Sequence, residues 1–239
     1  MNELSGKTVI VAGAAGGIGE GVTRRLLEHG ATVAALSRSE KNLERLQSYV
    51  SDVSTGTFVA LRADLDQDED GSRELRRTLH GRFGPADGAV VAIGNWGHAN
   101  RSMLDVSDEA WSQSLKDNLT SHFRAMRILV PLVKPNGALV HLSGLSADGP
   151  YPGAGLIGLT NAAKKSLVLT MAAEREVDGP RIYELILGPI RTRERVARGV
   201  AMPRGYRPED IGERIAELVR GGTAASRSAL HYMIQRESE

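Results

Sequence analysis

The chain has 239 residues, 41% of them hydrophobic and 25% charged, so it can bury a sizeable core. Thirty basic and 29 acidic residues give a formal net charge of +1, which argues against nucleic acid or an anionic membrane as a partner. The absence of cysteine excludes disulfides, thiolate catalysis and cysteine-ligated metal.

Short apolar runs alternate with segments of helical periodicity along the whole chain. This alternation predicts a doubly wound parallel α/β sheet with helices on both faces. Strands are expected at residues 8–13, 31–37, 57–63, 88–94, 137–143, 182–188 and 228–234. Helices are expected at residues 18–29, 41–50, 71–81, 108–131, 156–177 and 208–220. No linker or repeat interrupts the series, so residues 1–239 are predicted to form a single domain, with a mobile loop or short lid at 191–207.

The N-terminal residues contain no basic stretch followed by a long apolar run, and no segment reaches the roughly 18 apolar residues of a membrane span. The lack of cysteine is compatible with a reducing compartment. We therefore expect a soluble, cytoplasmic protein whose partners are small molecules or copies of itself.

A glycine-rich turn follows the first predicted strand. Gly13, Gly17 and Gly19 have the spacing G-x-x-x-G-x-G, with Ile18 between the last two. Glycine lets the chain turn sharply and lets a pyrophosphate approach the backbone, while the following helix offers free amides and the positive end of its dipole. This first strand-to-helix junction is predicted to bind a dinucleotide.

The end of the second strand indicates which coenzyme is bound. NAD sites place a carboxylate there for the ribose 2′-hydroxyl, whereas this sequence has Ser37 and Arg38. A guanidinium attracts a 2′-phosphate that a carboxylate would repel. We therefore expect NADP(H), with NAD(H) as the less favoured coenzyme.

With these residues placed, the chain resembles the short-chain dehydrogenase/reductase family, which implies a Rossmann-like fold. The resemblance assigns Asp64 and Leu65 to the adenine and Gly94 to passage of the backbone beside the ribose. The segment LGPIRT is similar to the family's nicotinamide-binding segment and implies roles for Ile190 and Thr192.

The same resemblance implies catalytic roles for Asn118, which would keep a water within reach of the lysine, and for Lys164, which in the family lowers the pKa of the tyrosine phenol and also contacts the nicotinamide ribose. Four residues before Lys164, where the family has a catalytic tyrosine, the sequence has Thr160. An aliphatic hydroxyl is far less acidic than a phenol and reaches less far. If Lys165 were the motif lysine, Asn161 would replace the tyrosine, which is no better.

Other proton donors and orienting groups remain open. The position of the family's serine aligns with Gly144, so Ser143, Ser146 or neither supplies that hydroxyl. Tyr151 and His98 lie in loops that border the expected cleft, as does Trp96, whereas His141 is expected to be a core side chain.

Two functions follow from these matches. The first is an atypical NADP(H)-dependent oxidoreductase of this family, working without the usual tyrosine. The alternative is a catalytically degenerate coenzyme-binding, sensing or partner-binding module, or a non-redox isomerase or cyclase.

The resemblance also implies a homodimer or homotetramer through the fourth and fifth helices, 108–131 and 156–177. The scattered histidines predict no metal site.

Overall fold

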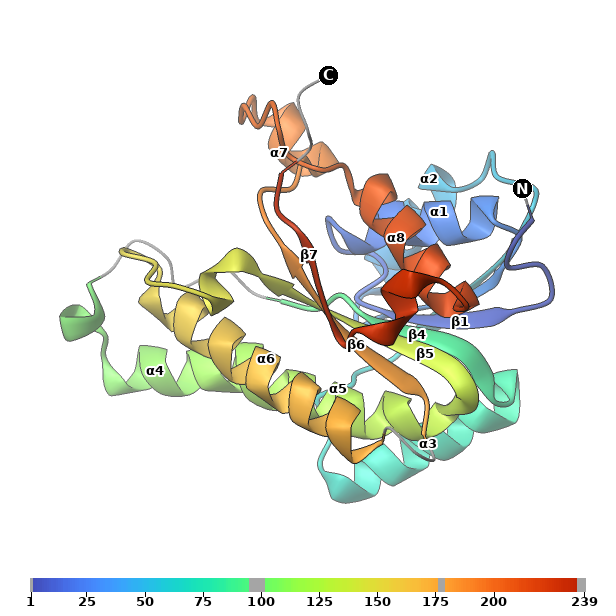
Figure 1. Cartoon of the computed structure of the whole chain (residues 1–239), viewed down its shortest axis with the longest axis horizontal. Coiled ribbons are helices and arrows are strands. Elements are labelled where there is room, and N and C mark those ends of the chain that lie inside the picture. Colours follow the sequence, from blue (N-terminus) through green and yellow to red (C-terminus); the bar gives the residue numbers. More distant parts are fainter. Residues whose placement is uncertain (1, 95–101, 176–178, 236–239) are drawn as a thin grey trace.

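The computed structural model describes residues 2–94, 102–175 and 179–235, and its strands form one parallel sheet (Figure 1). The order in the sheet is β3-β2-β1-β4-β5-β6-β7, and every neighbouring pair is parallel. The strand bounds are β1 Thr8–Ala12, β2 Thr32–Ser37, β3 Thr57–Arg62, β4 Ala86–Val91, β5 Val133–Gly144, β6 Arg181–Leu187 and β7 Leu230–Met233. The predicted doubly wound sheet of about seven strands is thus confirmed.

Helices cover both faces of the sheet (Figure 1). One face carries α1 (Gly19–Glu28), α2 (Glu40–Tyr49) and α8 (Pro208–Arg220). The other face carries α3 (Glu69–Phe83), α4 (Asp108–Leu115), α5 (Ser121–Leu129) and α6 (Gly155–Glu174). The short helix α7 (Arg193–Ala197) projects beyond the carboxyl ends of the strands.

Local capping explains where several helices begin. The Ser39 hydroxyl accepts a hydrogen bond from the Asn42 amide at the start of α2, and Asp68 accepts one from the Gly71 amide at the start of α3. Such caps satisfy amides that have no partner inside the helix. A single polar side chain thus marks the start of α2 and of α3.

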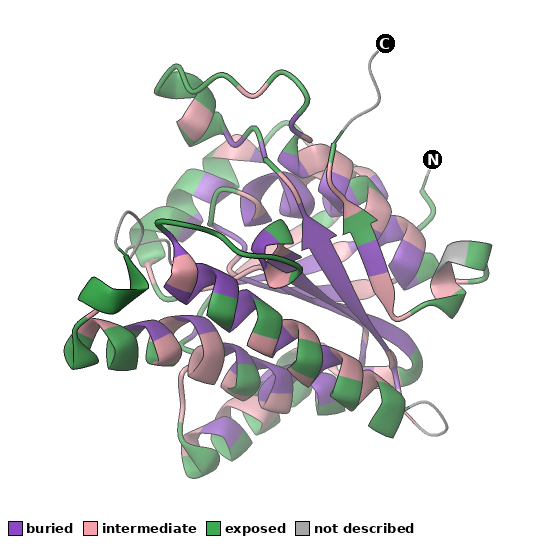
Figure 2. Ribbon diagram, turned by 60° about the vertical axis from the view of Figure 1, so that its left-hand side comes forward, coloured by how far each residue is buried: buried purple, intermediate pink, exposed green. Residues whose placement is uncertain are grey.

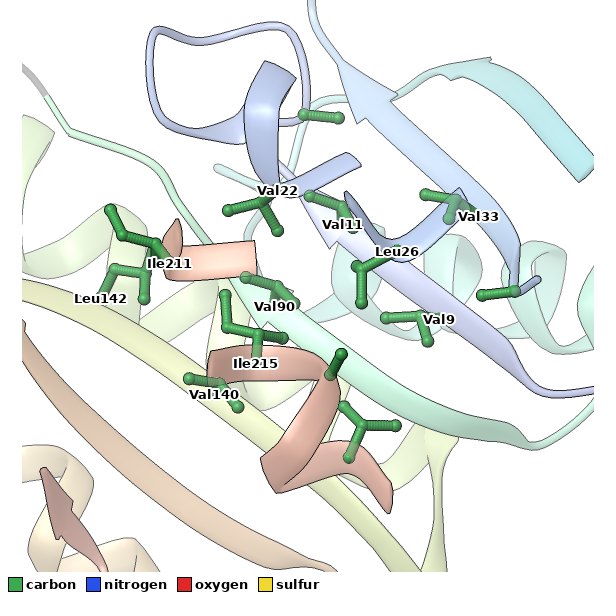
Figure 3. Packing of buried hydrophobic residues seen from close by; sticks show 14 of the residues in the cluster. Val9, Val11, Val22, Leu26, Val33, Val90, Val140, Leu142, Ile211 and Ile215 are labelled. Carbon is green, nitrogen blue, oxygen red and sulfur yellow. The ribbon is translucent and has the colours of Figure 1, made fainter. Parts of the chain in front are cut away.

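Two apolar clusters lie on opposite sides of the sheet. Figure 3 shows the first, in which Val140 and Leu142 of β5 pack with Ile211 and Ile215 of α8. The second includes Leu139, which precedes Val140 in β5 and points to the other face, and packs under α3, α5 and α6. Figure 2 shows the central strands of the sheet mostly buried between the helical layers, whereas the edge strands β3 and β7 are more exposed. Such two-sided burial explains the near-continuous apolar runs of the strand sequences.

The expected helix 108–131 is wrong in detail. Between α4 and α5 the chain makes a π-helical turn, Lys116–Thr120, and the Ser121 amide bonds to the carbonyl oxygen of Lys116. The Ser121 hydroxyl also donates to the Asp117 carbonyl oxygen at 2.6 Å, which helps to widen the turn. A 3₁₀ turn, Val130–Leu132, then leads directly into β5, which begins four residues earlier than expected.

The least regular segment also differs from its expectation, because residues 193–197 of the predicted loop 191–207 form α7. None of the helices in the described part of the chain combines the length and the apolar character needed to cross a bilayer.

Candidate functional site

A cavity of about 490 Å³ opens at the carboxyl ends of β1, β2, β3 and β4. It lies where the sheet order reverses direction between β1 and β4, the place where open α/β sheets bind ligands. Its lining contains most of the adenosine-side residues expected from the sequence: Gly13, Ser37, Arg38, Asp64, Leu65 and Gly94. The structure therefore brings together side chains and backbone from four separate strand ends.

The glycine-rich turn is built on close backbone contacts. Gly13 has a φ of +77°, and a β-carbon there would lie 2.5 Å from the Ala92 carbonyl oxygen. A β-carbon on Gly19 would lie 2.1 Å from the Gly13 carbonyl oxygen. Helix α1 then begins without a side-chain cap at Ile18, so its first amides face the turn without competition from a capping side chain.

Gly17 lies beside the segment that follows β6. A β-carbon on Gly17 would come within 3.1 Å of the Thr192 methyl carbon, Cγ2. Thr192 caps α7 by accepting a hydrogen bond from the Arg195 amide, and Ile190 is buried next to it. The segment expected at the pyrophosphate and the segment expected at the nicotinamide thus lie side by side.

Helix α7 is tied to α1 by Arg193. The Arg193 Nε atom lies 2.8 Å from Oε1 of the buried Glu20, and its guanidinium lies 4.0 Å above the ring of Tyr49. This ion pair joins the segment after β6 to the helix that begins at the glycine-rich turn.

The corner beyond β2 is polar. Ser37 ends the strand, and its hydroxyl accepts a hydrogen bond from the Ser39 amide at 3.2 Å, while the Arg38 side chain is exposed. Asn42 also lines the cavity, and Arg45 donates a hydrogen bond to the Ala15 carbonyl oxygen at 3.0 Å. Sequence analysis missed Asn42 and Arg45, although their three-residue spacing puts them on one side of α2.

Asn118 and Lys164 are both buried in the second layer of helices. Asn118 lies in the π-helical turn, and Lys164 lies on α6, which packs against that turn and against β6. Burial lowers the pKa of Lys164 from 10.5 to about 8, and the negative charge of Glu184 partly opposes this shift. Lys164 is thus a buried amine whose proton is unusually easily lost.

Lys165 is in a different environment. Its ammonium pairs with Asp148 at 2.5 Å and contacts the Tyr232 hydroxyl at 3.1 Å on the surface. The Asp148 carboxylate raises the pKa of Lys165 by hydrogen bonding. Of the two candidate lysines, Lys164 is therefore the buried one.

The Thr160 hydroxyl is directed into its own helix. It is fully buried and donates to the Leu156 carbonyl oxygen at 2.9 Å, with the Ile157 carbonyl oxygen at 3.2 Å. Asn161, the next residue, donates to the Ser146 hydroxyl at 2.9 Å. A β-carbon on Gly144 would approach the Asn161 amide nitrogen at 2.9 Å, so the glycine leaves room for this contact.

The remaining candidates lie apart from one another. Ser143 is buried at the end of β5, and within the described residues its hydroxyl has no hydrogen-bond partner. Tyr151 is 47% exposed and lines a separate hollow beside α6, together with Ser146 and Leu159. His98 and Trp96 lie outside the described residues. The structure thus does not place Tyr151 in the coenzyme-sized cavity.

A chain of buried titratable side chains runs beneath Lys164 and Asn118. His141 Nδ1 lies 2.6 Å from Glu184 Oε2, and His141 Nε2 lies 2.8 Å from His122 Nδ1. All three side chains are fully buried. His141 is therefore a buried side chain, as expected, but it belongs to a polar chain rather than to an apolar core.

Sequence analysis missed Glu184 and His122. Two signals were available: Glu184 interrupts the apolar run of the sixth strand, and His122 lies four residues after Asn118 on the same helical face. Within the described residues, no group of three or more acidic or histidine side chains is arranged to hold a metal ion.

The residues present fit a phosphorylated dinucleotide. The glycine-rich turn leaves no space for a side chain, α1 begins there without a cap, and the polar corner offers Ser37, Arg38 and Asn42 to a phosphate. Lys164 lies in the neighbouring helical layer. The arrangement is suited to bind a coenzyme along the strand ends and to move a proton near its far end.

The comparisons with known proteins agree with this geometry. The family described as enoyl-(acyl carrier protein) reductase matches residues 13–221. The chain is 33% identical to the 2,5-dichloro-2,5-cyclohexadiene-1,4-diol dehydrogenase of Sphingobium indicum over 205 residues, 80% of this chain and 76% of the relative.

Two solved structures share the fold. A putative short chain dehydrogenase from Pseudomonas syringae has a TM-score of 0.83 at 24% identity, covering 97% of this chain and 95% of its own. The NADPH-bound short chain oxidoreductase of Pseudomonas aeruginosa PAO1, described as containing an atypical catalytic center, has a TM-score of 0.82 at 23% identity. That alignment covers 97% of this chain and 96% of the other.

Proposed function

Because the chain belongs to the short-chain dehydrogenase/reductase family, we propose that it is an NADP(H)-dependent oxidoreductase that transfers hydride to or from a carbonyl or alcohol substrate. Residues 1–239 would form one dinucleotide-binding domain. The observation that carries this proposal is the polar corner beyond β2, where Ser37 and the exposed Arg38 occupy the place of an NAD-selecting carboxylate.

Each segment of the cavity has a role in this proposal. Gly13, Gly17, Ile18 and Gly19 receive the pyrophosphate, and Ser37 and Arg38 receive the 2′-phosphate. Asp64, Leu65 and Gly94 contact the adenosine side, and Ile190 and Thr192 contact the nicotinamide side. The coenzyme, when bound, supplies the hydride chemistry. Lys164 and Asn118 position the ribose and the substrate oxygen.

The proposed enzyme is atypical because no phenol accompanies Lys164. The Thr160 hydroxyl donates to the backbone of α6, so its proton is directed away from a substrate. Ser143 is the buried hydroxyl at the end of β5 that could orient a substrate, and Tyr151 would have to approach from the separate hollow beside α6. The proton therefore comes from a group other than Thr160.

The experiment is isothermal calorimetry with NADPH and NADH. We expect NADPH to bind more tightly than NADH, and Arg38→Asp to reverse this order, because the introduced carboxylate repels a 2′-phosphate and bonds to a 2′-hydroxyl. Losing one charge-assisted contact to phosphate corresponds to about a tenfold or greater loss of NADPH affinity. Turnover is then followed by NADPH oxidation over a panel of carbonyl compounds.

Lys41→Asp is the matched control, because it makes the same change of charge at an exposed residue of α2 outside the cavity lining. It should leave both affinities within about twofold, since exposed charges at this range are screened by salt. Absence of binding of either coenzyme to the wild-type protein would overturn the proposal.

A second function is favoured by a specific observation. The side chains around the tyrosine position are committed to structural contacts: Thr160 to its helix and Asn161 to Ser146. This is the arrangement expected of a coenzyme-sensing or partner-binding module, or of a non-redox isomerase or cyclase. NADPH binding without turnover of any compound in the carbonyl panel would favour this alternative.

Assembly is also part of the proposal. Trp111 on α4, Phe123 on α5 and Leu159 on α6 are large apolar side chains that are partly exposed on the outer helical layer. A homodimer or homotetramer formed through these helices would cover them. Light scattering that gives the mass of one chain would contradict this assembly.

The expected cytoplasmic location stays a prediction from the sequence.

A further inference from the structure

Arg193, the first residue of α7, makes contacts that reach beyond its own segment. Its Nε and Nη2 atoms donate to the two carboxylate oxygens of Glu20, at 2.8 and 3.1 Å, so the two side chains pair through two hydrogen bonds. The guanidinium carbon of Arg193 also lies 4.0 Å from the centre of the Tyr49 ring. One side chain therefore joins α7 to the first turn of α1 and to the last residue of α2.

The pair between Arg193 and Glu20 differs from an ordinary surface ion pair. The side chain of Glu20 is only 7% exposed, whereas that of Arg193 is 49% exposed. The carboxylate has been taken out of water, and two-point pairing with a guanidinium compensates for that loss better than a single contact does. The attraction between the guanidinium and the Tyr49 ring adds to this pairing. Removal of Arg193 would leave a buried carboxylate without this cation.

The Tyr49 ring on which Arg193 lies is itself fixed in place. Its hydroxyl donates to Glu209 Oε1 at 2.6 Å, in the first turn of α8, and its carbonyl oxygen accepts a hydrogen bond from Arg24 of α1 at 3.0 Å. Burial, and then the hydrogen bond to Glu209, raises the pKa of Tyr49, so the phenol remains a donor at neutral pH. Arg193 therefore contacts a ring that is bonded to two other helices.

Other polar contacts of the segment after β6 are internal. The Thr192 hydroxyl accepts a hydrogen bond from the Arg195 amide, and the Arg195 guanidinium donates to the Ile190 carbonyl oxygen at 3.0 Å. These bonds shape the segment but do not hold it against the rest of the molecule. Ile190 and Thr192, which are expected on the nicotinamide side, are linked to α1 through their neighbour Arg193.

The link lies beside the glycine-rich turn. The Thr192 methyl group is packed so closely there that a β-carbon on Gly17 would come within 3.1 Å of it. Glu20 follows Gly17 by three residues, about one helical turn. Movement of α7 away from α1 would therefore separate the segment expected at the pyrophosphate from the segment expected at the nicotinamide.

We propose that Arg193 is a positioning residue of the coenzyme site: it fastens the nicotinamide-side segment to the helix that receives the pyrophosphate. This inference rests on the coenzyme-dependent function proposed above. Arg193 acts through Thr192 and Glu20 and does not itself contact the coenzyme. The pyrophosphate and the nicotinamide are common to NADPH and NADH, so the tether contributes equally to the binding of both, whereas Arg38 distinguishes between them.

The first test follows α7 in the coenzyme-free protein by hydrogen-exchange mass spectrometry. Arg193→Met removes both hydrogen bonds but keeps an unbranched side chain, and Glu20→Gln removes the charge from the other side without leaving a carboxylate buried alone. We expect the amides of residues 193–198 to exchange about tenfold faster in each variant, because a charge-assisted pair is lost. Exchange in the double variant should be no faster than in the faster single variant, since both residues act through one contact.

Unchanged exchange of α7 in both single variants would overturn the tether, whether or not a coenzyme binds. Because Glu20→Gln leaves no buried charge uncompensated, it keeps this test decisive if Arg193→Met does not fold.

The second test measures the affinities for NADPH and NADH by calorimetry. We expect Arg193→Met to weaken both by about tenfold and to change their ratio by less than about twofold. Arg193→Lys keeps the charge but not the fork of donors, so it should recover part of the loss. NADPH should in turn slow the exchange of α7 in the wild type, because the coupling between two linked equilibria is reciprocal. Faster exchange with unchanged affinities would show that Arg193 is only structural, which overturns the proposal and leaves the proposed function standing.

Arg198→Met is the matched control. It makes the same substitution in the same segment, but Arg198 pairs with Glu194, one helical turn earlier, so no contact with α1 is lost. Exchange of α7 and both affinities should stay within about twofold of the wild type. If Arg198→Met has the same effects as Arg193→Met, the loss comes from the charge of the segment and the proposal is wrong. Absence of coenzyme binding to the wild type would instead overturn the proposed function, and this inference with it.

Discussion

The two faces of the sheet are built from the same strands but bury different chemistry. Toward α1 and α8, β5 presents Val140 and Leu142, which pack in the first apolar cluster (Figure 3). Toward α5 and α6, the same strand presents His141 and Ser143, and β6 adds Glu184. Buried polar groups cost stability unless they are paired, so the second face holds chemistry that folding alone does not require.

The largest expected effect is the loss of stability that follows removal of an apolar side chain from the face toward α1 and α8. Ile215→Ala removes a fully buried side chain of α8 and leaves a cavity between the helix and the strands. We expect the free energy of unfolding, measured by urea denaturation, to fall by about 3 kcal/mol. Val196→Ala, at a residue 54% exposed on α7, should change it by less than about 0.5 kcal/mol. Equal losses in the two variants would show that this face does not carry the stability.

The second prediction measures what it costs the protein to bury a charged side chain on the polar face, by varying the pH. Burial lowers the pKa of Lys164 to about 8 from 10.5 in the unfolded chain. Between pH 8 and pH 10.5 the unfolded chain binds more protons at Lys164 than the folded chain does, so the free energy of unfolding rises with pH. Below pH 8 the folded protein bears the whole cost of burying the Lys164 ammonium. Lys164→Met removes this cost, so its stability relative to the wild type should fall by up to about 3 kcal/mol from pH 7 to pH 10.5.

Lys165→Met is the control for this measurement, since Lys165 lies on the surface beside Asp148 and its pKa is raised rather than lowered. Urea denaturation at several pH values should show no such trend for this variant. A Lys164→Met curve parallel to that of the wild type would mean that Lys164 is not desolvated.

The smallest expected effect concerns Thr160. Its hydroxyl donates to carbonyl oxygens of its own helix, so Thr160→Val should change the free energy of unfolding by less than about 1 kcal/mol. Turnover should be nearly unchanged, rather than reduced by the about 10²- to 10⁴-fold typical of a lost proton donor. A loss of that size would place the Thr160 hydroxyl at the reacting atoms.

The fold was predictable because its signals are local. The apolar run before Gly13, the turn itself and the helix after it specify the first strand-to-helix unit, and the alternation then repeats. The π-helical turn was not predictable from helical periodicity, since the apolar pattern of residues 108–131 continues across it. An added bond from the Ser121 hydroxyl to the Asp117 carbonyl oxygen accompanies this turn, and helical periodicity carries no sign of it.

The coenzyme-facing residues were predictable for a related reason: Ser37, Arg38 and Asp64 each stand at a strand end, and the carboxyl ends of parallel strands meet at one edge. The polar chain beneath Lys164 was not found, because it depends on which residues of β5 and β6 lie opposite each other and on how α5 packs over them. The strand register and the helix packing depend on tertiary structure, which the sequence of a single strand or helix does not reveal.

The pairing of His141 with Glu184 has a consequence for how the chain assembles. The two residues are opposed in the register of β5 and β6. A slip of one residue between these strands would turn the carboxylate toward α8, among aliphatic side chains that offer no donor. The hydrogen bond between the two buried side chains therefore penalises misregistered sheets while the protein folds.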